Sequence, residues 1–109
     1  MLVPAPACAE WVKIGTSRMA VHYVDPATVR KDGHLRRVWA MQDMVDADGN
    51  GVMSIRALQE YDCAQPRFRY LTMEAYSAPM GGGWIVVTHQ MRDGWSNRAS
   101  AIGKMVCGI

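Results

Sequence analysis

The feature that most constrains this chain is the alternation of side chains in the segment that ends at Cys63. Over residues 52–63 one face carries Ile55, Ala57, Tyr61 and Cys63, and the opposite face carries Arg56, Glu60 and Asp62. A period of two is typical of a strand with one face against a core and the other toward solvent. This segment therefore predicts a strand of an antiparallel sheet, with a cysteine at its end.

Alternation recurs along the chain and predicts five further strands. We expect them at residues 11–14, 18–25, 34–44, 67–76 and 84–88. Asp32-Gly33 is typical of a tight hairpin turn. Asp25-Pro26 is expected to end the second strand, with Asp25 capping one helical turn over residues 26–30. The glycines 81–83 predict a wide turn before the last strand.

The pattern changes near the C-terminus. From residue 97 onward one face of a short helix carries Ala99, Ile102, Met105 and Val106. Ser96 or Asn97 is the expected N-cap, and Gly103 weakens this helix by about 1 kcal/mol relative to alanine. We therefore expect an α+β fold: a single antiparallel sheet of about six strands, with a short C-terminal helix packed on one face.

The three cysteines, Cys8, Cys63 and Cys107, lack the spacing of a zinc or redox motif. Residues 1–9 are small and apolar, and both Ala5-Pro6-Ala7 and Ala7-Cys8-Ala9 match the small-x-small pattern before a signal-peptidase cut. We interpret residues 1–9 as a signal-peptide remnant or a disordered N-terminal tail, and residues 10–109 as one domain. A lipidated Cys8 is a third interpretation.

The fate of Cys8 bears on the other two cysteines. If residues 1–9 are removed during export, Cys63 and Cys107 remain and can pair. That disulfide would close a loop of about 45 residues, would stabilise the fold by about 4 kcal/mol in the chain-entropy model, and would anchor the weak terminal helix. In a reducing compartment both cysteines stay buried thiols. No apolar run approaches the length of a membrane span.

The sharpest local motif is the acidic loop at residues 46–51. Asp46, Asp48, Asn50 and Gly51 match positions 1, 3, 5 and 6 of an EF-hand calcium loop. The twelfth position, which needs a bidentate carboxylate, is Ala57. We interpret the loop as a hydrophilic hairpin connection and keep calcium binding through Asp46, Asp48 and Asn50 as an alternative.

Other functional classes find little support in the sequence. The net charge is +2 and the arginines are scattered, which does not indicate nucleic-acid binding. The histidines are too dispersed for a metal site, and no catalytic constellation or cofactor motif stands out. An aromatic-basic surface would combine Tyr61, Tyr70, Tyr76, Arg67 and Arg69. We favour the simpler interpretation, in which one side of these strands is core and the other is solvated.

Several landmarks together resemble the surface-adhesin protein E family. They are Trp11-Val12-Lys13-Ile14-Gly15, Tyr23-Val24-Asp25, Arg36-Arg37-Val38-Trp39, Glu60-Tyr61-Asp62-Cys63, Arg69-Tyr70-Leu71, Tyr76-Ser77-Ala78-Pro79-Met80-Gly81-Gly82-Gly83 and Cys107. The resemblance implies an exported bacterial protein, an antiparallel sheet and a C-terminal helix held by a disulfide. It also implies attachment to host surface and matrix proteins. The calcium-like loop and a short segment between Gln90 and Ala99 depart from the family.

The sequence and this resemblance lead to one functional hypothesis. We expect a non-enzymatic bacterial domain, located in the periplasm or at the cell surface, that binds a protein partner such as a host matrix protein. The contact surface is expected on the sheet face that the helix leaves free, or at an edge strand. A homodimer is a candidate assembly. The alternatives are an EF-hand-like calcium module and an envelope domain with a housekeeping role and no host ligand.

Overall fold

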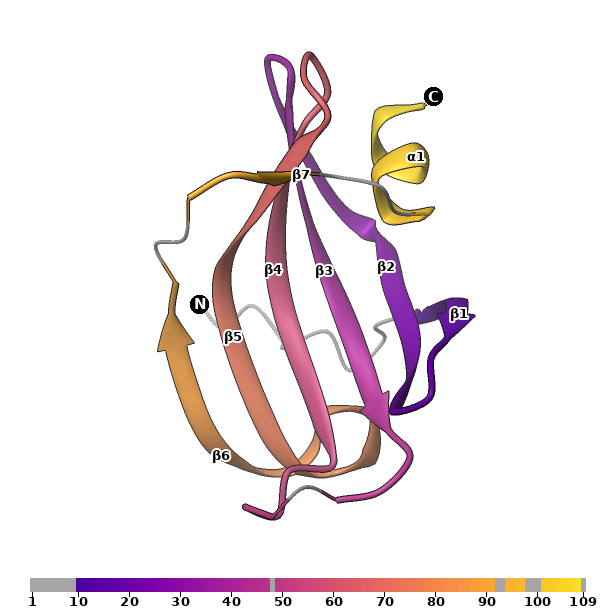
Figure 1. The fold of residues 1–109 in the computed structure, drawn as a ribbon, viewed down its shortest axis with the longest axis vertical. Helices are drawn as coiled ribbons and strands as arrows, with labels where there is room; N and C mark the ends of the chain where they lie inside the picture. Colours follow the sequence, from indigo (N-terminus) through magenta and orange to yellow (C-terminus); the bar gives the residue numbers. More distant parts are fainter. Residues whose placement is uncertain (1–9, 48, 92–93, 98–100, 109) are drawn as a thin grey trace, which may run out of the picture.

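The computed structural model describes residues 10–47, 49–91, 94–97 and 101–108. Residues 1–9, with Cys8 and the expected signal-peptide remnant, lie outside the described residues. Six strands form the main antiparallel sheet, a short seventh joins it, and one helix follows (Figure 1). In chain order the elements are β1 (Val12–Thr16), β2 (Ala20–Asp32), β3 (Leu35–Met44), β4 (Ser54–Asp62), β5 (Arg67–Ala78), η1 (Pro79–Gly81), β6 (Gly82–Gln90), β7 (Ser96–Asn97) and α1 (Ala101–Cys107).

Each of the six main strands pairs with the next strand along the chain, so the spatial order is β1-β2-β3-β4-β5-β6. The β2–β3 turn is tight because Asp32 pairs with Leu35 and Gly33 adopts a positive φ of 59°, which glycine tolerates best. β7 pairs with the first two residues of β5. The fold class expected from the sequence is therefore confirmed.

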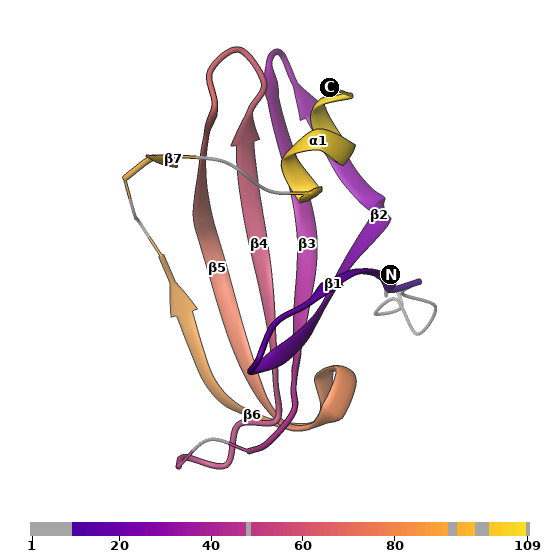
Figure 2. The ribbon, with the colours of Figure 1, turned by 45° about the vertical axis from the view of Figure 1, so that its right-hand side comes forward.

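α1 lies across β2, β3 and β4 on one face of the sheet (Figure 2). Its buried residues Ile102 and Val106 pack with Val24, Val38 and Tyr61 in the hydrophobic core. The hydroxyl of Tyr61 is buried and donates a 2.7 Å hydrogen bond to Gln59 Oε1. This bond replaces the one that the hydroxyl would make to water. We call this side of the sheet the helix face, and the other side the open face.

A disulfide ties the helix to the sheet, as expected. Cys63, directly after β4, is bonded to Cys107, the last residue of α1, with their Cα atoms 5.4 Å apart. The backbone N–H of Cys63 also donates to His34 O, which holds the end of β4 against the start of β3. The disulfide therefore fixes the helix at the end of the sheet where β3 begins and β4 ends.

The helical turn predicted over residues 26–30 is wrong, because β2 runs through this segment. The pairing between β2 and β3 shifts register between Asp25 and Arg30. Asp25 Oδ1 does accept a hydrogen bond from the Ala27 amide, as a cap would, but Thr28 Oγ1 then accepts one from the Trp39 amide of β3. This hydroxyl keeps the Trp39 amide bonded to β2 across the irregularity, so the strand continues as a bulge.

The predicted start of the C-terminal helix is also wrong. Ser96 and Asn97, the expected N-caps, form β7 and pair with Phe68 and Arg67 of β5. Ala99 lies outside the described residues, and α1 begins at Ala101. Local propensity at Ser96 and Asn97 is overridden by strand pairing, which adds hydrogen bonds that an exposed cap does not supply.

The glycine-rich segment forms a turn that is shorter than expected. η1 spans Pro79–Gly81, and β6 already begins at Gly82. Gly83 has a φ of 71°, and a Cβ at this position would overlap Ser77 Oγ, so only glycine fits. η1 folds onto the open face, where Ser54 Oγ donates to Ala78 O and accepts from the Gly81 amide.

Candidate binding surface

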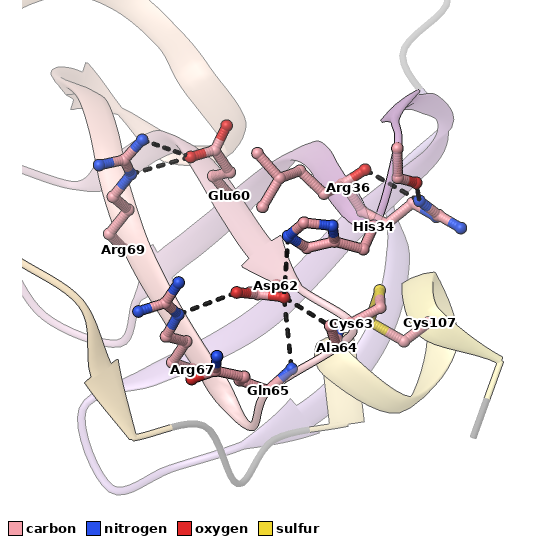
Figure 3. Close-up of polar contacts among 12 residues, drawn as sticks. His34, Arg36, Glu60, Asp62, Cys63, Ala64, Gln65, Arg67, Arg69 and Cys107 are labelled. Atoms are coloured by element: carbon pink, nitrogen blue, oxygen red, sulfur yellow. Dashed lines mark hydrogen bonds and ion pairs between the residues drawn. A yellow bond between two sulfur atoms is a disulfide. The ribbon is translucent and has the colours of Figure 1, made fainter.

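The open face carries arginines and carboxylates from neighbouring strands. Directly paired residues of an antiparallel sheet share a face, and β4 pairs Glu60 with Arg37 of β3 and with Arg69 of β5. Both guanidinium groups bond this one carboxylate: Arg37 Nε lies 2.9 Å from Oε2 and Arg69 Nη2 lies 2.7 Å from Oε1. Figure 3 shows the Arg69 part of this arrangement. Glu60 therefore joins three strands.

Glu60 is ionised although only 1% of its side chain is exposed. Burial by itself raises the pKa of a carboxyl group, because it removes water from the charged form. The hydrogen bonds and positive charges of Arg37 and Arg69 outweigh that effect and hold the pKa of Glu60 below its ordinary value. One carboxylate thus fixes two arginines and leaves an excess of positive charge around it.

Asp62, two residues further along β4, organises the turn beside the disulfide (Figure 3). Its Oδ2 accepts from Arg67 Nε at 2.9 Å, and its Oδ1 accepts from the backbone amides of Ala64 and Gln65. His34 Nε2 lies 3.7 Å from Oδ1. Burial raises the pKa of Asp62, but these hydrogen bonds, Arg67 first among them, bring it below its ordinary value.

A third carboxylate, Glu74 of β5, links a tyrosine to an arginine. Its Oε1 accepts from Arg56 Nη2 at 2.7 Å and from the Tyr76 hydroxyl at 2.6 Å. Burial raises the pKa of Glu74, but the hydrogen bonds from Tyr76 and Arg56 outweigh this effect. The pKa of Glu74 is therefore below its ordinary value. Burial and the bond to Glu74 raise the pKa of Tyr76. Both residues therefore keep their ordinary protonation at neutral pH.

Tryptophans stack on these fixed arginines. The Arg56 guanidinium carbon lies 4.3 Å from the centre of the Trp39 ring. Trp95, just before β7, sits 4.5 Å from the guanidinium carbon of Arg67 and 4.4 Å from that of Arg69. Such cation–π contacts stabilise by about 0.5–2 kcal/mol each, depending on exposure. Indole rings and guanidinium groups therefore share the open face.

One pocket of about 460 Å³ opens on this face. It is lined by Trp11, Thr28, Arg30, Arg37, Trp39, Arg56 and Leu58. Its lining combines three guanidinium groups with apolar side chains and includes no carboxylate. A pocket of this size accommodates a drug-sized ligand or a few side chains of a partner.

The residues of the aromatic-basic surface considered in the sequence analysis lie on two different faces of the sheet. Leu71 is an extra residue in β5 at the point where its pairing with β4 shifts register. Tyr70 before it therefore lies on the helix face with Tyr61, whereas Tyr76 after it lies on the open face with Arg67 and Arg69. The favoured interpretation has a core side and a solvated side. The core side is correct for Tyr61, which is buried, but the solvated side is wrong for Glu60 and Asp62, which are also buried.

The open-face aromatics that do gather were not singled out from the sequence. Trp39 and Arg56 are 17 positions apart in the chain, and they meet because β3 pairs with β4. Arg37, Trp39 and Met41 occupy alternate positions of β3, and this alternation is the signal that could have placed them on one face. Trp11 comes from the segment before β1, and no local pattern predicts its approach to the pocket.

The acidic loop joins β3 to β4, two strands, whereas an EF-hand loop joins two helices. Asp46 and Asn50 are exposed, and Asp48 lies outside the described residues. Within the described part of the chain, no three His, Cys, Asp or Glu side chains gather closely enough to hold a metal ion. Calcium binding through Asp46, Asp48 and Asn50 stays a hypothesis.

β6 is the second notable surface. It pairs with β5 on one side and is the last strand in the sheet order, so among the described residues its other side is an edge. Its large apolar residues are exposed, from Trp84 at 73% to Val86 at 37%, with Ile85 and Val87 between these values. Edge strands usually carry charges or prolines that block pairing, and β6 carries neither.

Comparison with known proteins identifies the family. The family model described as surface-adhesin protein E matches residues 11–108. The chain belongs to the surface-adhesin protein E family. This match confirms the resemblance seen in the sequence motifs. Among proteins with curated descriptions, no sequence is detectably similar to this chain.

Solved structures of Haemophilus influenzae protein E share the fold. Crystal form II matches with a TM-score of 0.59 and 12% identity, covering 89% of this chain and 96% of that chain. The selenomethionine form matches with a TM-score of 0.58 and 12% identity, covering 88% of this chain and 94% of that chain.

α1, the helix among the described residues, has seven residues, far fewer than a membrane span needs.

Proposed function

We propose that this chain is an exported, non-catalytic bacterial domain that binds a host extracellular matrix protein. Membership of the surface-adhesin protein E family supports an adhesin-like surface protein. The Cys63–Cys107 disulfide supports export, because disulfides persist in oxidising compartments outside the cytosol. The fold offers its open face and its β6 edge for contact.

The observation that carries this proposal is the exposed apolar edge of β6. An edge strand presents a row of backbone N–H and C=O groups to which an extended segment of a partner can add as a further strand. Trp84, Ile85 and Val87 are more than two-fifths exposed, so they offer side-chain contacts beside that backbone. The edge therefore suits the addition of a strand from a protein partner.

The proposal is tested by binding of the purified domain to an immobilised panel of matrix glycoproteins and collagens. We expect saturable binding to at least one of them. Val86→Lys, which places a charge in the middle of the edge, should weaken it about tenfold or more. The matched control is Val45→Lys, because Val45 is also exposed but lies in the β3–β4 loop. Absence of saturable binding would leave the envelope domain without host ligand as the better account.

A second copy of the chain is another occupant of the same edge. In a homodimer, β6 of one protomer would pair with β6 of its partner and cover part of the exposed apolar side chains. Light scattering after size exclusion separates this assembly from the monomer. A dimer in the wild type that Val86→Lys converts to a monomer, while Val45→Lys does not, would assign the edge to self-association.

A further inference from the structure

We propose that the pocket on the open face binds an acidic segment of the protein partner. Arg30 and Arg37 would contact the carboxylate, and Trp11, Trp39 and Leu58 would contact an apolar side chain next to it. This inference rests on the proposed protein-binding function and names the chemistry of the segment that is bound. The site is distinct from the β6 edge, which lies across β4 and β5 from the pocket-lining residues of β3.

The charge of the lining sets the sign of the ligand. Three arginines line the pocket without a carboxylate among them. Two of them are ion-paired behind the lining: Arg56 with Glu74, and Arg37 with Glu60, which also neutralises Arg69. Arg30 donates to the carbonyl oxygens of Ala27 and Val29, and no described carboxylate pairs with it. Asp25 sits next to Trp39 in the strand register but is buried, with Oδ1 engaged by the Ala27 amide. The uncompensated charge at the pocket is therefore positive.

Arg37 is held ready for a second carboxylate. It meets Glu60 through Nε, which leaves the donors of its two terminal nitrogens for another acceptor. Half of its side chain is exposed, whereas Glu60 is buried beneath it. An arginine that is already fixed loses less conformational freedom when it binds a carboxylate, so its contribution to affinity is larger.

The apolar part of the pocket lining favours a ligand that carries an apolar group beside its anionic group. Leu58 and the two indole rings of Trp11 and Trp39 border the same volume. An inorganic phosphate or sulfate would leave them uncovered. Arg56 occupies one face of Trp39, so a sugar ring could stack on the other face of that indole only. An acidic residue beside an aliphatic one satisfies both parts of the pocket.

The test uses two capped peptides and the indole N–H signals of the ¹⁵N-labelled protein. The probe is acetyl-Glu-Leu-Leu-Glu-amide, and its matched control replaces both glutamates with glutamine. We expect the acidic peptide to move the Trp11 and Trp39 signals saturably and to leave that of Trp84 on β6 unchanged. Trp→Phe variants assign the signals. A sulfated disaccharide and inorganic phosphate serve as the other anion sources.

Variants then locate the contact. Arg37→Gln should lower the affinity for the acidic peptide about tenfold or more. Arg30→Gln should also lower this affinity. The substitution removes an exposed side chain that pairs with no described carboxylate, so the fold is retained. Lys31→Gln is the matched control, because Lys31 is the exposed neighbour of Arg30 and pairs in register with Arg36, on the other face.

The outcomes separate this proposal from the proposed function. No saturable shift with the acidic peptide, or a shift with the sulfated disaccharide alone, overturns the pocket. Matrix binding that survives Arg37→Gln unchanged also overturns it, while the proposed function stands. A peptide response that the arginine variants abolish, in a domain that binds no matrix protein, supports the pocket and removes the adhesin function.

Discussion

Glu60 is the residue on which most of the open face depends. Its carboxylate is buried, bonds Arg37 and Arg69, and so connects β3, β4 and β5. Removing one member of such a buried group leaves charges and donors without a partner. The two arginines are one-third to one-half exposed, so water screens part of that loss.

We expect Glu60→Gln to lower the free energy of unfolding by about 1–2 kcal/mol, because the amide cannot bond two guanidinium groups as a carboxylate does. Urea denaturation followed by tryptophan fluorescence measures the change. Glu10→Gln, at an exposed position before β1, is the matched control and should change stability little. Equal effects of the two substitutions would show that the buried carboxylate contributes no more than a solvated one.

At the scale of elements, α1 depends on two attachments. It is a seven-residue helix with a glycine inside it, shorter than an isolated helix can be in water. Ile102 and Val106 bury it against β2, β3 and β4, and Cys107 bonds it to Cys63. The covalent attachment matters most in the unfolded chain, where it closes a long loop.

We expect the double variant Cys63→Ala/Cys107→Ala to lose about 3–4 kcal/mol of stability in the chain-entropy model. Amide exchange should speed up in α1 more than in β3 and β4, because the helix loses its anchor while the strands keep their ladder. Reduction of the wild type should reproduce both effects and leave the double variant unchanged. Alkylation of both Cys63 and Cys107 in the native, unreduced protein would contradict the disulfide.

On the scale of the whole molecule, the sheet separates two kinds of interaction. The helix face buries apolar side chains under α1, and the open face carries arginine–carboxylate contacts with three buried or half-buried carboxylates. Glu60, Asp62 and Glu74 all have lowered pKa values in the folded protein. Stability must therefore depend on pH in the acid range.

Acid should destabilise the protein. The ordinary pKa values are 4.5 for Glu60 and Glu74 and 3.8 for Asp62. Near these values the unfolded chain takes up protons that the folded protein does not, so stability is full above about pH 5 and falls below it. Urea midpoints from pH 7 to pH 3 measure this dependence. The double variant Glu60→Gln/Glu74→Gln should show a shallower fall, and an unchanged slope would contradict the assignment.

Alternation and turn chemistry predicted the main strands, a single antiparallel sheet and the terminal helix. These signals are local: a strand with one buried face needs a period of two, and Asp32-Gly33 needs only its own backbone preferences. The sequence predicted the pairing of Cys63 with Cys107 on the condition that residues 1–9 are removed, and the structure forms this disulfide. The sequence motifs led to the correct family.

The tertiary structure alone decided where the strands bulge and which side chains meet. The sequence predicted a helical turn after Asp25, but Thr28 bonds the Trp39 amide of the neighbouring strand and β2 continues. The bulge at Leu71 places Tyr70 and Tyr76 on opposite faces. A shift of one residue reverses every later side chain, and nothing within a single strand reports it, because its cause is the register with the neighbour. For the same reason the pocket, built by side chains from β2, β3, β4 and the segment before β1, could not be predicted from the sequence.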